Sequence, residues 1–300
     1  ALGLEASDIL PASTGVIGAQ LKMDLWEKAA PALAANLGKA TPEDFARAIM
    51  TTDAFHKISH REVSLPGGVV KLVGMAKGAG MICPNMATML SVVLCDAQVE
   101  ASVWQKMLRD AVDLTFNRVT VDGDTSTNDT LYGLANGASG VSASDEESIK
   151  ALSAALTSVL GDLAYMLVKD GEGASKVARI HVTGAASDAD AERVARTVGH
   201  SQLVKTALYG RDANWGRIVA AVGRSGADFN PDDVVVTLCG VELFRKGQPT
   251  DLDFDALLQE PLKQRDLPID IVLGSGSGSY TLLASDLGHE YVNVNADYRS

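Results

Sequence analysis

The sequence predicts an α/β fold, built as a layered α/β sandwich with mixed sheets. Strand-like apolar runs and helix-start signals follow one another along the whole chain. The strands are not separated regularly by single crossover helices, so mixed strand directions are favoured over a simple doubly wound parallel sheet. At 300 residues, the chain is long enough to bury a large core.

Three helices are indicated by the residues at their starts. Thr41 offers an N-cap, with a proline next and an acid three residues on. Ser144 begins a capping-box pattern before a long apolar-periodic segment that reaches about residue 168. Ser187 opens a third helix, through residue 197.

Strands are predicted between these helices from short apolar, β-branched runs. They cover residues 68–75, 89–95, 178–183, 234–239, 269–273, 280–284 and 291–295. The glycine-rich stretch at 274–279 superficially resembles a dinucleotide-binding turn, but a second strand rather than a helix follows it. We therefore expect a hairpin-like loop there.

Composition excludes several classes of protein. Hydrophobic residues make up 46% and charged residues 21%, and no uninterrupted apolar run reaches the roughly 20 residues of a membrane span. We expect a soluble protein with no membrane partner. A net charge of −12 and a pI near 4.8 disfavour nucleic acid as a partner.

Cysteine and histidine spacing predicts neither disulfides nor a metal site. Cys83, Cys95 and Cys239 stand singly among apolar neighbours, which favours buried thiols in a reducing compartment, the cytoplasm by default. The five histidines lack metal-ligand spacing. Cys83 has no histidine close in sequence, and we interpret it as a packing residue.

The most informative stretch is KGAGMICPNMATML, residues 77–90. In it a glycine-rich turn runs into Ala87 and Thr88 at the start of an apolar β-type run. A threonine after a small residue at the mouth of a buried strand suits the nucleophile of a self-cleaving enzyme. Threonine is also β-branched and suits the start of any strand, so this pattern alone leaves both readings open.

Four polar segments add to this hypothesis. Residues 12–18 combine a hydroxyl with two glycines, a composition able to aim backbone N–H groups at an oxyanion. Residues 121–129 gather hydroxyls and carboxylates, residues 169–173 set an acid between two glycines, and residues 212–217 combine a charge, an amide, an indole and a guanidinium. Each alone suits a solvated loop, whereas together they favour a catalytic or binding protein.

Seven motifs occur in order: ASTGVIG, MTTD, GMICPNMATML, VDGDTSTNDT, KDGEGASK, LVKTALYGRDANWGRI and YVNVNADYRS. With them the chain resembles the glutamate N-acetyltransferase / ornithine acetyltransferase family of arginine biosynthesis over essentially its whole length. The resemblance implies a fold and mechanism like those of N-terminal-nucleophile hydrolases, cleavage between Ala87 and Thr88, and ping-pong transfer of acetyl from N-acetylornithine to glutamate. It implies no cofactor, and some members accept acetyl-CoA as a co-substrate.

The resemblance also implies roles for individual residues. Thr88 is the nucleophile and the Ala87-Thr88 bond is the cleavage site, while Thr14 and Gly15 form the oxyanion hole. The substrate contacts are Thr51, Lys77, Thr88, Glu172, Asn295 and Ser300. These residue types suit an amino acid, because Lys77 supplies a cation for a carboxylate and Glu172 an anion for an α-ammonium.

The resemblance divides the chain at the cleavage site. Residues 1–87 correspond to an α-chain portion, and residues 88–300 to a β-chain portion that begins with the nucleophile. Family members usually carry a further segment before ASTGVIG, so we expect the α-chain portion to be truncated at its N-terminus. The two chains of one precursor are expected to assemble as a heterotetramer or larger.

Three departures from the family pattern are visible among these motifs, and two other functions stay open. Ala54, Phe55 and His56 follow MTTD where Thr and Pro are usual, Cys83 stands where a small residue is common, and the chain ends in Ser300 where Thr is common. An amidohydrolase or aminopeptidase of the same type would pass the acyl group to water. A non-enzymatic ligand-binding domain would leave the chain uncut.

Overall fold

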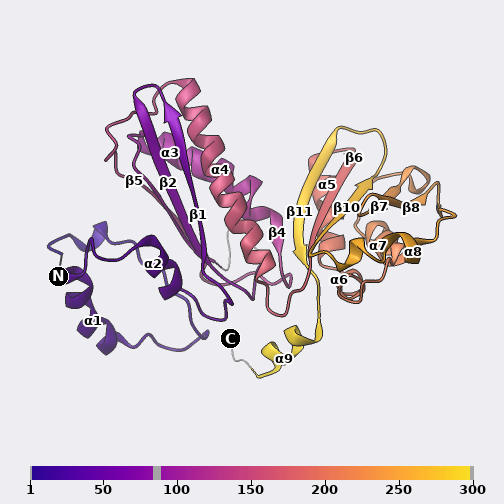
Figure 1. The fold of residues 1–300 in the computed structure, drawn as a ribbon, viewed down its shortest axis with the longest axis horizontal. Coiled ribbons are helices and arrows are strands. Elements are labelled where there is room, and N and C mark those ends of the chain that lie inside the picture. Colours follow the sequence, from indigo (N-terminus) through magenta and orange to yellow (C-terminus); the bar gives the residue numbers. More distant parts are fainter. Residues whose placement is uncertain (1, 84–88, 298–300) are drawn as a thin grey trace.

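The computed structural model, which describes residues 2–83 and 89–297, contains two mixed β-sheets with helices packed on them (Figure 1). The smaller sheet has the order β1 (Lys57–Leu65), β2 (Gly68–Lys77), β3 (Leu90–Cys95) and β5 (Thr130–Ala135). The larger has the order β4 (Val119–Thr120), β11 (Gly278–Ser285), β6 (Val177–Ala185), β10 (Asp266–Val272), β7 (Val235–Leu238), β8 (Val241–Arg245) and β9 (Gln248–Pro249). The predicted layered α/β fold with mixed strand directions is confirmed, since β3–β5 and β6–β10 are parallel and β1–β2 and β6–β11 antiparallel.

The helices follow the strands in two groups. Near the smaller sheet lie α2 (Pro42–Ala48), α3 (Ala101–Leu114) and α4 (Glu146–Lys169), while α1 (Met23–Ala35) lies apart from it. The larger sheet carries α5 (Asp188–Gly199), α6 (Gln202–Tyr209), α7 (Trp215–Gly223) and α8 (Phe254–Leu258), and α9 (His289–Asp297) follows β11. Short 3₁₀ turns occupy Ala6–Asp8, Phe116–Arg118, Pro231–Asp233 and Pro261–Lys263.

The long helix α4 joins the two halves. It packs on β1 and β2, lies beside α3, and reaches β4 and β11 of the larger sheet. Gly74 of β2 permits this contact, because a Cβ there would stand 2.6 Å from Val159 of α4. By length and composition alone α4 could cross a membrane, which is weak support for a span. Its leucines at 152, 156, 160, 163 and 167 are completely buried in a shared core, as in the core helix of a globular protein.

Helix-start signals were predicted well because capping is local. Thr41 accepts a hydrogen bond from the Asp44 N–H and closes a capping box, and the Ser187 side chain caps α5. The start of α4 differs by one residue. Its N-cap is Asp145 rather than Ser144, since the Asp145 carboxylate accepts from the Ser148 N–H.

Two sequence predictions about the C-terminal region are wrong. Residues 291–295 alternate like a strand but form helix α9, in which the Asn295 side chain donates to the Tyr291 carbonyl one turn earlier. Residues 274–279 do connect two strands, yet not as a hairpin. Strand β6 lies between β10 and β11 and pairs with both, so the connection passes over β6.

Residues 2–40 lie on the outside of the molecule. None of the residues of α1 is buried, and α1 lies away from both sheets in Figure 1. Helix α2 contacts β1 and β2 and buries Ala46 completely. The chain therefore enters the packed structure at α2, directly before the predicted substrate residue Thr51.

Candidate active site

The predicted site residues fall into three groups in the structure. Ala87, Thr88 and Ser300 lie outside the described residues. Lys77, Glu172 and Asn295 come together with the chain around Thr51 near the C-terminal end of α4. Thr14 and Gly15 lie on the exposed N-terminal segment.

Glu172 is the centre of the assembled group. Its carboxylate accepts hydrogen bonds from the Thr52 hydroxyl and from the Asn295 side-chain amide, each at 2.9 Å. Its backbone N–H donates to the Ala79 carbonyl at 2.9 Å. An acid near the end of α4 is thereby joined to the MTTD segment, to the turn after β2 and to α9.

Two glycines, Gly173 and Gly80, allow these close approaches around Glu172. Gly173 has φ +68°, and a Cβ there would stand 2.5 Å from the Tyr291 backbone nitrogen of α9. At Gly80, a Cβ would stand 2.5 Å from the Glu172 carboxylate and displace it. The glycine that follows Glu172 in the sequence thus has a packing reason, and so does Gly80 in the turn after β2.

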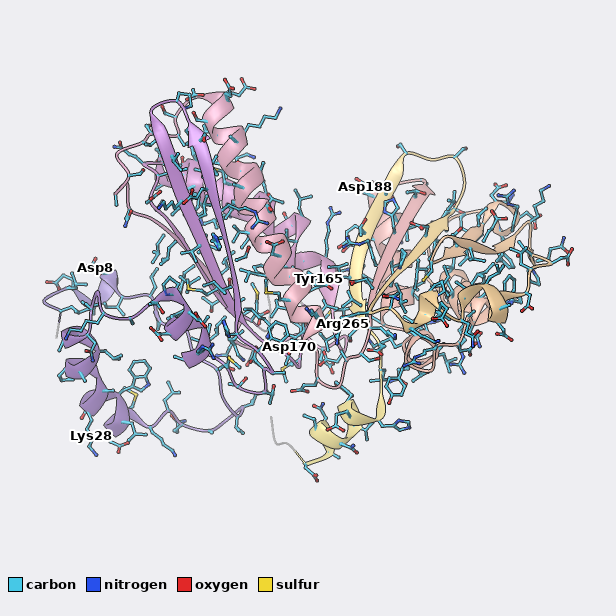
Figure 2. The ribbon with its side chains drawn as sticks, viewed as in Figure 1. Asp8, Lys28, Tyr165, Asp170, Asp188 and Arg265 are labelled. Carbon is cyan, nitrogen blue, oxygen red and sulfur yellow. The ribbon has the colours of Figure 1, made fainter. Side chains whose placement is uncertain are left out.

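A buried ion-pair triad lies beneath this group. The Lys57 ammonium contacts Asp53 at 2.6 Å and Asp170 at 2.5 Å, and the three side chains are at most 3% exposed. Burial disfavours the charge of Asp53, but the Lys57 ammonium and the Gly78 N–H outweigh it and hold the pKa of that carboxyl below its ordinary value. For Asp170, which directly follows α4 (Figure 2), burial prevails and raises the pKa.

The two carboxylates of the triad also accept hydrogen bonds from backbone N–H groups. Asp53 accepts the N–H groups of Thr51 at 3.0 Å and Gly78 at 2.7 Å, and Asp170 accepts that of Ala54 at 3.1 Å. Three segments that carry predicted site residues are therefore fixed to one buried lysine. The sequence prediction missed Lys57, whose only local signal is its place four residues after Asp53.

Lys77 differs from Lys57 in having no such partner. It is 7% exposed, and its ammonium makes no hydrogen bond or ion pair with any residue in 2–83 or 89–297. Burial lowers the pKa of Lys77, while the carboxylates of Asp53, Asp129 and Glu172 oppose that change. Burying a cation without a partner costs folding free energy, and an anion that binds to it recovers part of that cost. Lys77 is therefore well suited to bind an anion.

Asp129 is a second buried charge that the sequence did not single out. Neither of its carboxylate oxygens has a hydrogen-bond partner among the described residues, and both are shielded from solvent. Burial raises the pKa of Asp129 to about 7, although the Met89 N–H and the Lys77 ammonium act in the opposite direction. The sequence had placed Asp129 only within a polar segment.

The segment before the predicted cleavage site is held by Asp122. Its carboxylate accepts the backbone N–H groups of Met81 at 2.6 Å and Ile82 at 3.0 Å. The next residue, Cys83, lies with its Sγ 3.5 Å from His200 Nε2, a contact that sequence distance concealed. Burial raises the pKa of the Cys83 thiol and lowers that of His200, so the pair is uncharged and the packing interpretation of Cys83 holds.

Thr14 and Gly15 are not joined to this group in the structure. Both are exposed, and a Cβ built on Gly15 meets nothing within 4 Å. The nearest anchor is three residues before Thr14, where the Tyr132 hydroxyl of β5 donates to the Pro11 carbonyl at 2.6 Å. The oxyanion-hole assignment stays a prediction.

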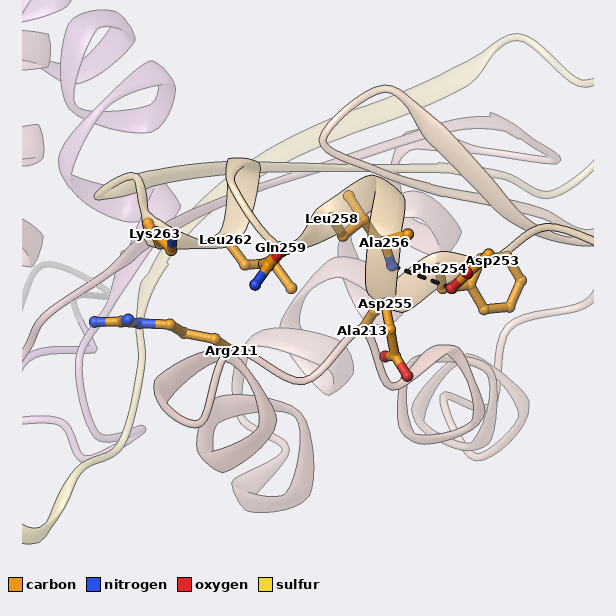
Figure 3. Close-up of a pocket in the computed structure, with 10 residues that line it drawn as sticks. All are labelled: Arg211, Ala213, Asp253, Phe254, Asp255, Ala256, Leu258, Gln259, Leu262 and Lys263. Carbon is orange, nitrogen blue, oxygen red and sulfur yellow. Dashed lines mark hydrogen bonds between the residues drawn. The ribbon is translucent and has the colours of Figure 1, made fainter.

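The motif at residues 212–217 has a structural role. Asn214 caps α7 by accepting the Arg217 N–H, and Trp215 stacks on Phe244 with ring centroids 5.6 Å apart. Beside it, a cavity of about 710 Å³ opens between Arg211 and α8 (Figure 3). None of the predicted site residues lines this cavity, and within the described ranges no cluster of three His, Cys, Asp or Glu side chains is arranged to hold a metal ion.

Comparison with known proteins gives consistent results. The family model described as "ArgJ family" matches residues 1–300. The arginine biosynthesis bifunctional protein ArgJ of Nitratidesulfovibrio vulgaris is 73% identical over 300 residues, covering 100% of this chain and 76% of the relative, and that of Syntrophotalea carbinolica is 46% identical with the same coverage. A crystal structure of the arginine biosynthesis bifunctional protein ArgJ from Bacillus halodurans matches with a TM-score of 0.65 and 36% identity, over 68% of this chain and 96% of that chain.

Proposed function

Because the chain belongs to the ArgJ family, whose named relatives are bifunctional arginine-biosynthesis proteins, we propose that it is a self-cleaving glutamate N-acetyltransferase. Its substrates would be N-acetyl-L-ornithine as acetyl donor and L-glutamate as acceptor. Free ornithine and N-acetylglutamate would be the products.

The observation that carries this proposal is the pair of opposite charges at Lys77 and Glu172. Both substrates have an α-carboxylate, which the Lys77 ammonium, without a partner among the described residues, can bind. Both also have a donor on the α-nitrogen, an amide N–H in acetylornithine and an ammonium in glutamate, which the Glu172 carboxylate can accept. Thr52 and Asn295 hold Glu172 in place through its two oxygens.

The chemical steps are proposed at Thr88. Its hydroxyl attacks the Ala87 carbonyl and converts the amide to an ester, and hydrolysis frees Thr88 as a new N-terminus. The free α-amine, with an ordinary pKa of about 7.7–8.0, then activates the same hydroxyl. Acetylornithine acetylates Thr88, the oxyanion is stabilised at Thr14 and Gly15, ornithine leaves, and the glutamate amine takes the acetyl group in a ping-pong cycle.

The length of the solved relative supports cleavage into two chains. The match covers 68% of these 300 residues, about 204 residues, and the same match is 96% of the solved chain. The solved chain therefore has about 210 residues, close to the 213 residues of positions 88–300. The solved Bacillus halodurans chain thus has the size of the proposed second product. We propose that the two products remain together and assemble as a heterotetramer or larger, and that acetyl-CoA is an additional acetyl donor.

Intact mass under denaturing conditions tests cleavage. The 31.4 kDa chain should give fragments of roughly 9 and 22 kDa, prorated by length. Thr88→Ala should remain a single chain without transferase activity, whereas Thr88→Ser should keep part of both. An active wild-type protein of undivided mass would refute the proposal.

A second assay separates the transferase from a hydrolase of the same type. Ornithine release from acetylornithine should depend on glutamate and produce one N-acetylglutamate for each ornithine. Release at an undiminished rate without glutamate, with acetate as product, would make the protein an amidohydrolase.

A further inference from the structure

A second cavity, which we call the α4 cavity, lies where α4 meets the larger sheet and has a volume of about 800 Å³. Its walls come from α4, from β6 and β11, from the end of α3 with the turn that follows it, and from Phe55. Tyr165 of α4 lines it and lies between the two halves of the molecule (Figure 2). None of the predicted site residues that the structure describes lines it. Its volume is in the range of about 300–1,000 Å³ that is typical of small-molecule sites.

Three cations, Arg118, Lys169 and Arg179, line the α4 cavity. None of them forms an ion pair with a carboxylate in residues 2–83 or 89–297. Arg118 donates through Nε to a backbone carbonyl at 2.9 Å, and its guanidinium lies 4.6 Å from the centre of the Tyr280 ring. The Lys169 ammonium lies 5.7 Å from the centre of the Phe55 ring. All three therefore keep the capacity to bind an anion.

The acids near these cations have other partners. Asp162 is the one acid among the described residues that line the cavity, and it accepts a hydrogen bond from the Arg61 guanidinium at 2.6 Å. Asp266 accepts from the Tyr165 hydroxyl at 3.1 Å. Burial and Asp266 raise the pKa of Tyr165, while nearby arginines, Arg179 among them, act in the opposite direction. The cavity therefore has an excess of positive charge in a protein whose net charge is −12, and such a local potential attracts anions.

The rest of the wall suits the organic part of a ligand. Phe55, Met166 and Leu283 supply apolar surface, and Leu283 lies directly opposite Arg179 in the pair of β6 and β11. Guanidinium groups bind phosphate through two N–H donors at once, and a lysine ammonium binds it as a point charge. Three cations beside an apolar surface therefore favour a polyanion with an organic body over a single carboxylate.

We propose that the α4 cavity binds an organic phosphate that has more than one phosphate group, as nucleotides do. Its phosphates would contact Arg118, Lys169 and Arg179, and its organic body would lie on the apolar wall. Two kinds of molecule have this chemistry. One is a coenzyme A ester, bound through its nucleotide end as a co-substrate, and the other is a free nucleotide that acts as an effector.

The position of the cavity gives such a ligand access to the candidate active site. The Phe55 ring has the Lys169 ammonium at 5.7 Å from its centre and the Lys57 ammonium of the buried triad at 5.1 Å. Asp170, which follows Lys169, contacts Lys57 at 2.5 Å, and Glu172 is two residues further on. A phosphate bound at Lys169 would thus lie beside the ion pairs that hold the active-site segments.

Calorimetric titration of the purified protein tests the proposal, with coenzyme A and ATP as separate probes and no divalent metal present. We expect at least one probe to bind the wild-type protein at low salt. Arg118→Gln and Arg179→Gln should each weaken that binding about 10-fold, through loss of one charge-assisted contact. Raising the salt from roughly 0.05 to 0.5 M should also weaken it, because screening shortens the reach of exposed charges.

Arg109→Gln and Lys150→Gln are the matched controls. They remove the same charge from exposed cations of α3 and α4 that do not line the cavity, so they should bind the probes as the wild type does. Tighter binding of coenzyme A than of ATP would indicate a co-substrate site, and the reverse order an effector site. Binding is measured without acetyl transfer, so this result and the test of the proposed function are independent.

Three outcomes would overturn the proposal. The first is that neither probe binds the wild-type protein at millimolar concentration. The second is that Arg118→Gln and Arg179→Gln, both folded by near-UV circular dichroism, bind as tightly as the two controls. If these variants fail to fold, the wild type decides, and binding that is unchanged over the same range of salt contradicts a site built from cations.

Discussion

Lys57 and Lys205 are both almost completely buried, one in each half of the molecule, and they are neutralised in different ways. Lys57 contacts two carboxylates, Asp53 and Asp170. The Lys205 ammonium donates instead to the carbonyl of Ser285 and, at 3.2 Å, to the hydroxyl of the same residue, and no carboxylate of the described residues is within ion-pair distance. Burial lowers the pKa of Lys205 to about 8.

Ion pairs determine the local structure around Lys57, and hydrogen bonds to uncharged groups determine it around Lys205. The carboxylates that neutralise Lys57 hold the backbone of Thr51, Gly78 and Ala54, so the ion pairs determine the shape of the candidate active site. Lys205 holds the end of β11, from which the chain continues to α9. The ion pairs of Lys57 hold the structure of its region, whereas Lys205, with its pKa lowered to about 8, can lose its proton at mildly alkaline pH.

Removing Lys57 should have the largest effect on stability. Lys57→Met leaves two buried carboxylates without their cation. We expect the free energy of unfolding, measured by urea titration, to fall by about 3–5 kcal/mol. The matched control is Lys71→Met, on the exposed face of β2, where the pair with Glu62 is solvated and should contribute about 0–1 kcal/mol. Equal effects of the two substitutions would show that the triad does not stabilise this half.

Lys77 extends the comparison, because it is a buried lysine in the same region that contacts no carboxylate of residues 2–83 or 89–297. If both substrates bind through their shared α-carboxylate, Lys77→Ala should weaken acetylornithine and glutamate together, by about 2–4 kcal/mol each in kcat/KM. Its effect on unfolding should be much smaller than that of Lys57→Met. A fall in kcat/KM for only one of the two substrates would indicate separate donor and acceptor sites.

Local and long-range features of this molecule differ in how well the sequence predicts them. Caps such as Thr41 and Ser187 were predicted because the donor and acceptor lie within three residues. The role of Lys57 was missed because Asp170 is 113 residues away, and the contact of Cys83 with His200 spans 117. Sheet order is also non-local, which is why the insertion of β6 between β10 and β11 was not foreseen.

Helix α9 shows how a local pattern can mislead. Tyr291 and the residues after it alternate in polarity as a strand would. No residue of α9 is buried, so this alternation does not face a core. The segment is held by polar contacts instead, through Asn295 to Glu172 and the Tyr291 hydroxyl to Asp122 at 3.4 Å.

The pH dependence of stability tests the second lysine. Since the pKa of Lys205 falls from about 10.4 in the unfolded chain to about 8 in the fold, the unfolded chain binds more protons between these values. The wild-type protein should therefore gain stability relative to Lys205→Met by roughly 2–3 kcal/mol as pH rises from 8 to above 10. The two proteins should differ by a constant amount below pH 8. A difference that stays constant up to pH 10.5 would mean that Lys205 remains charged in the fold.

The smallest predicted effect tests which of two adjacent threonines, Thr51 or Thr52, contributes more to activity. Resemblance to the acetyltransferase family assigns substrate contact to Thr51, but Asp53 holds the Thr51 backbone, and it is the Thr52 hydroxyl that donates to Glu172. Thr52→Val removes a hydrogen bond to a charged group at a partly exposed site, so we expect kcat/KM to fall by about 1–2 kcal/mol, roughly 5- to 30-fold. Thr51→Val has the same change in shape and leaves both the Asp53 contact and Glu172 intact, so in an uncrowded pocket it should cost less than about threefold. The opposite order would mean that Thr51 touches the substrate directly and that the Thr52 contact only supports the loop.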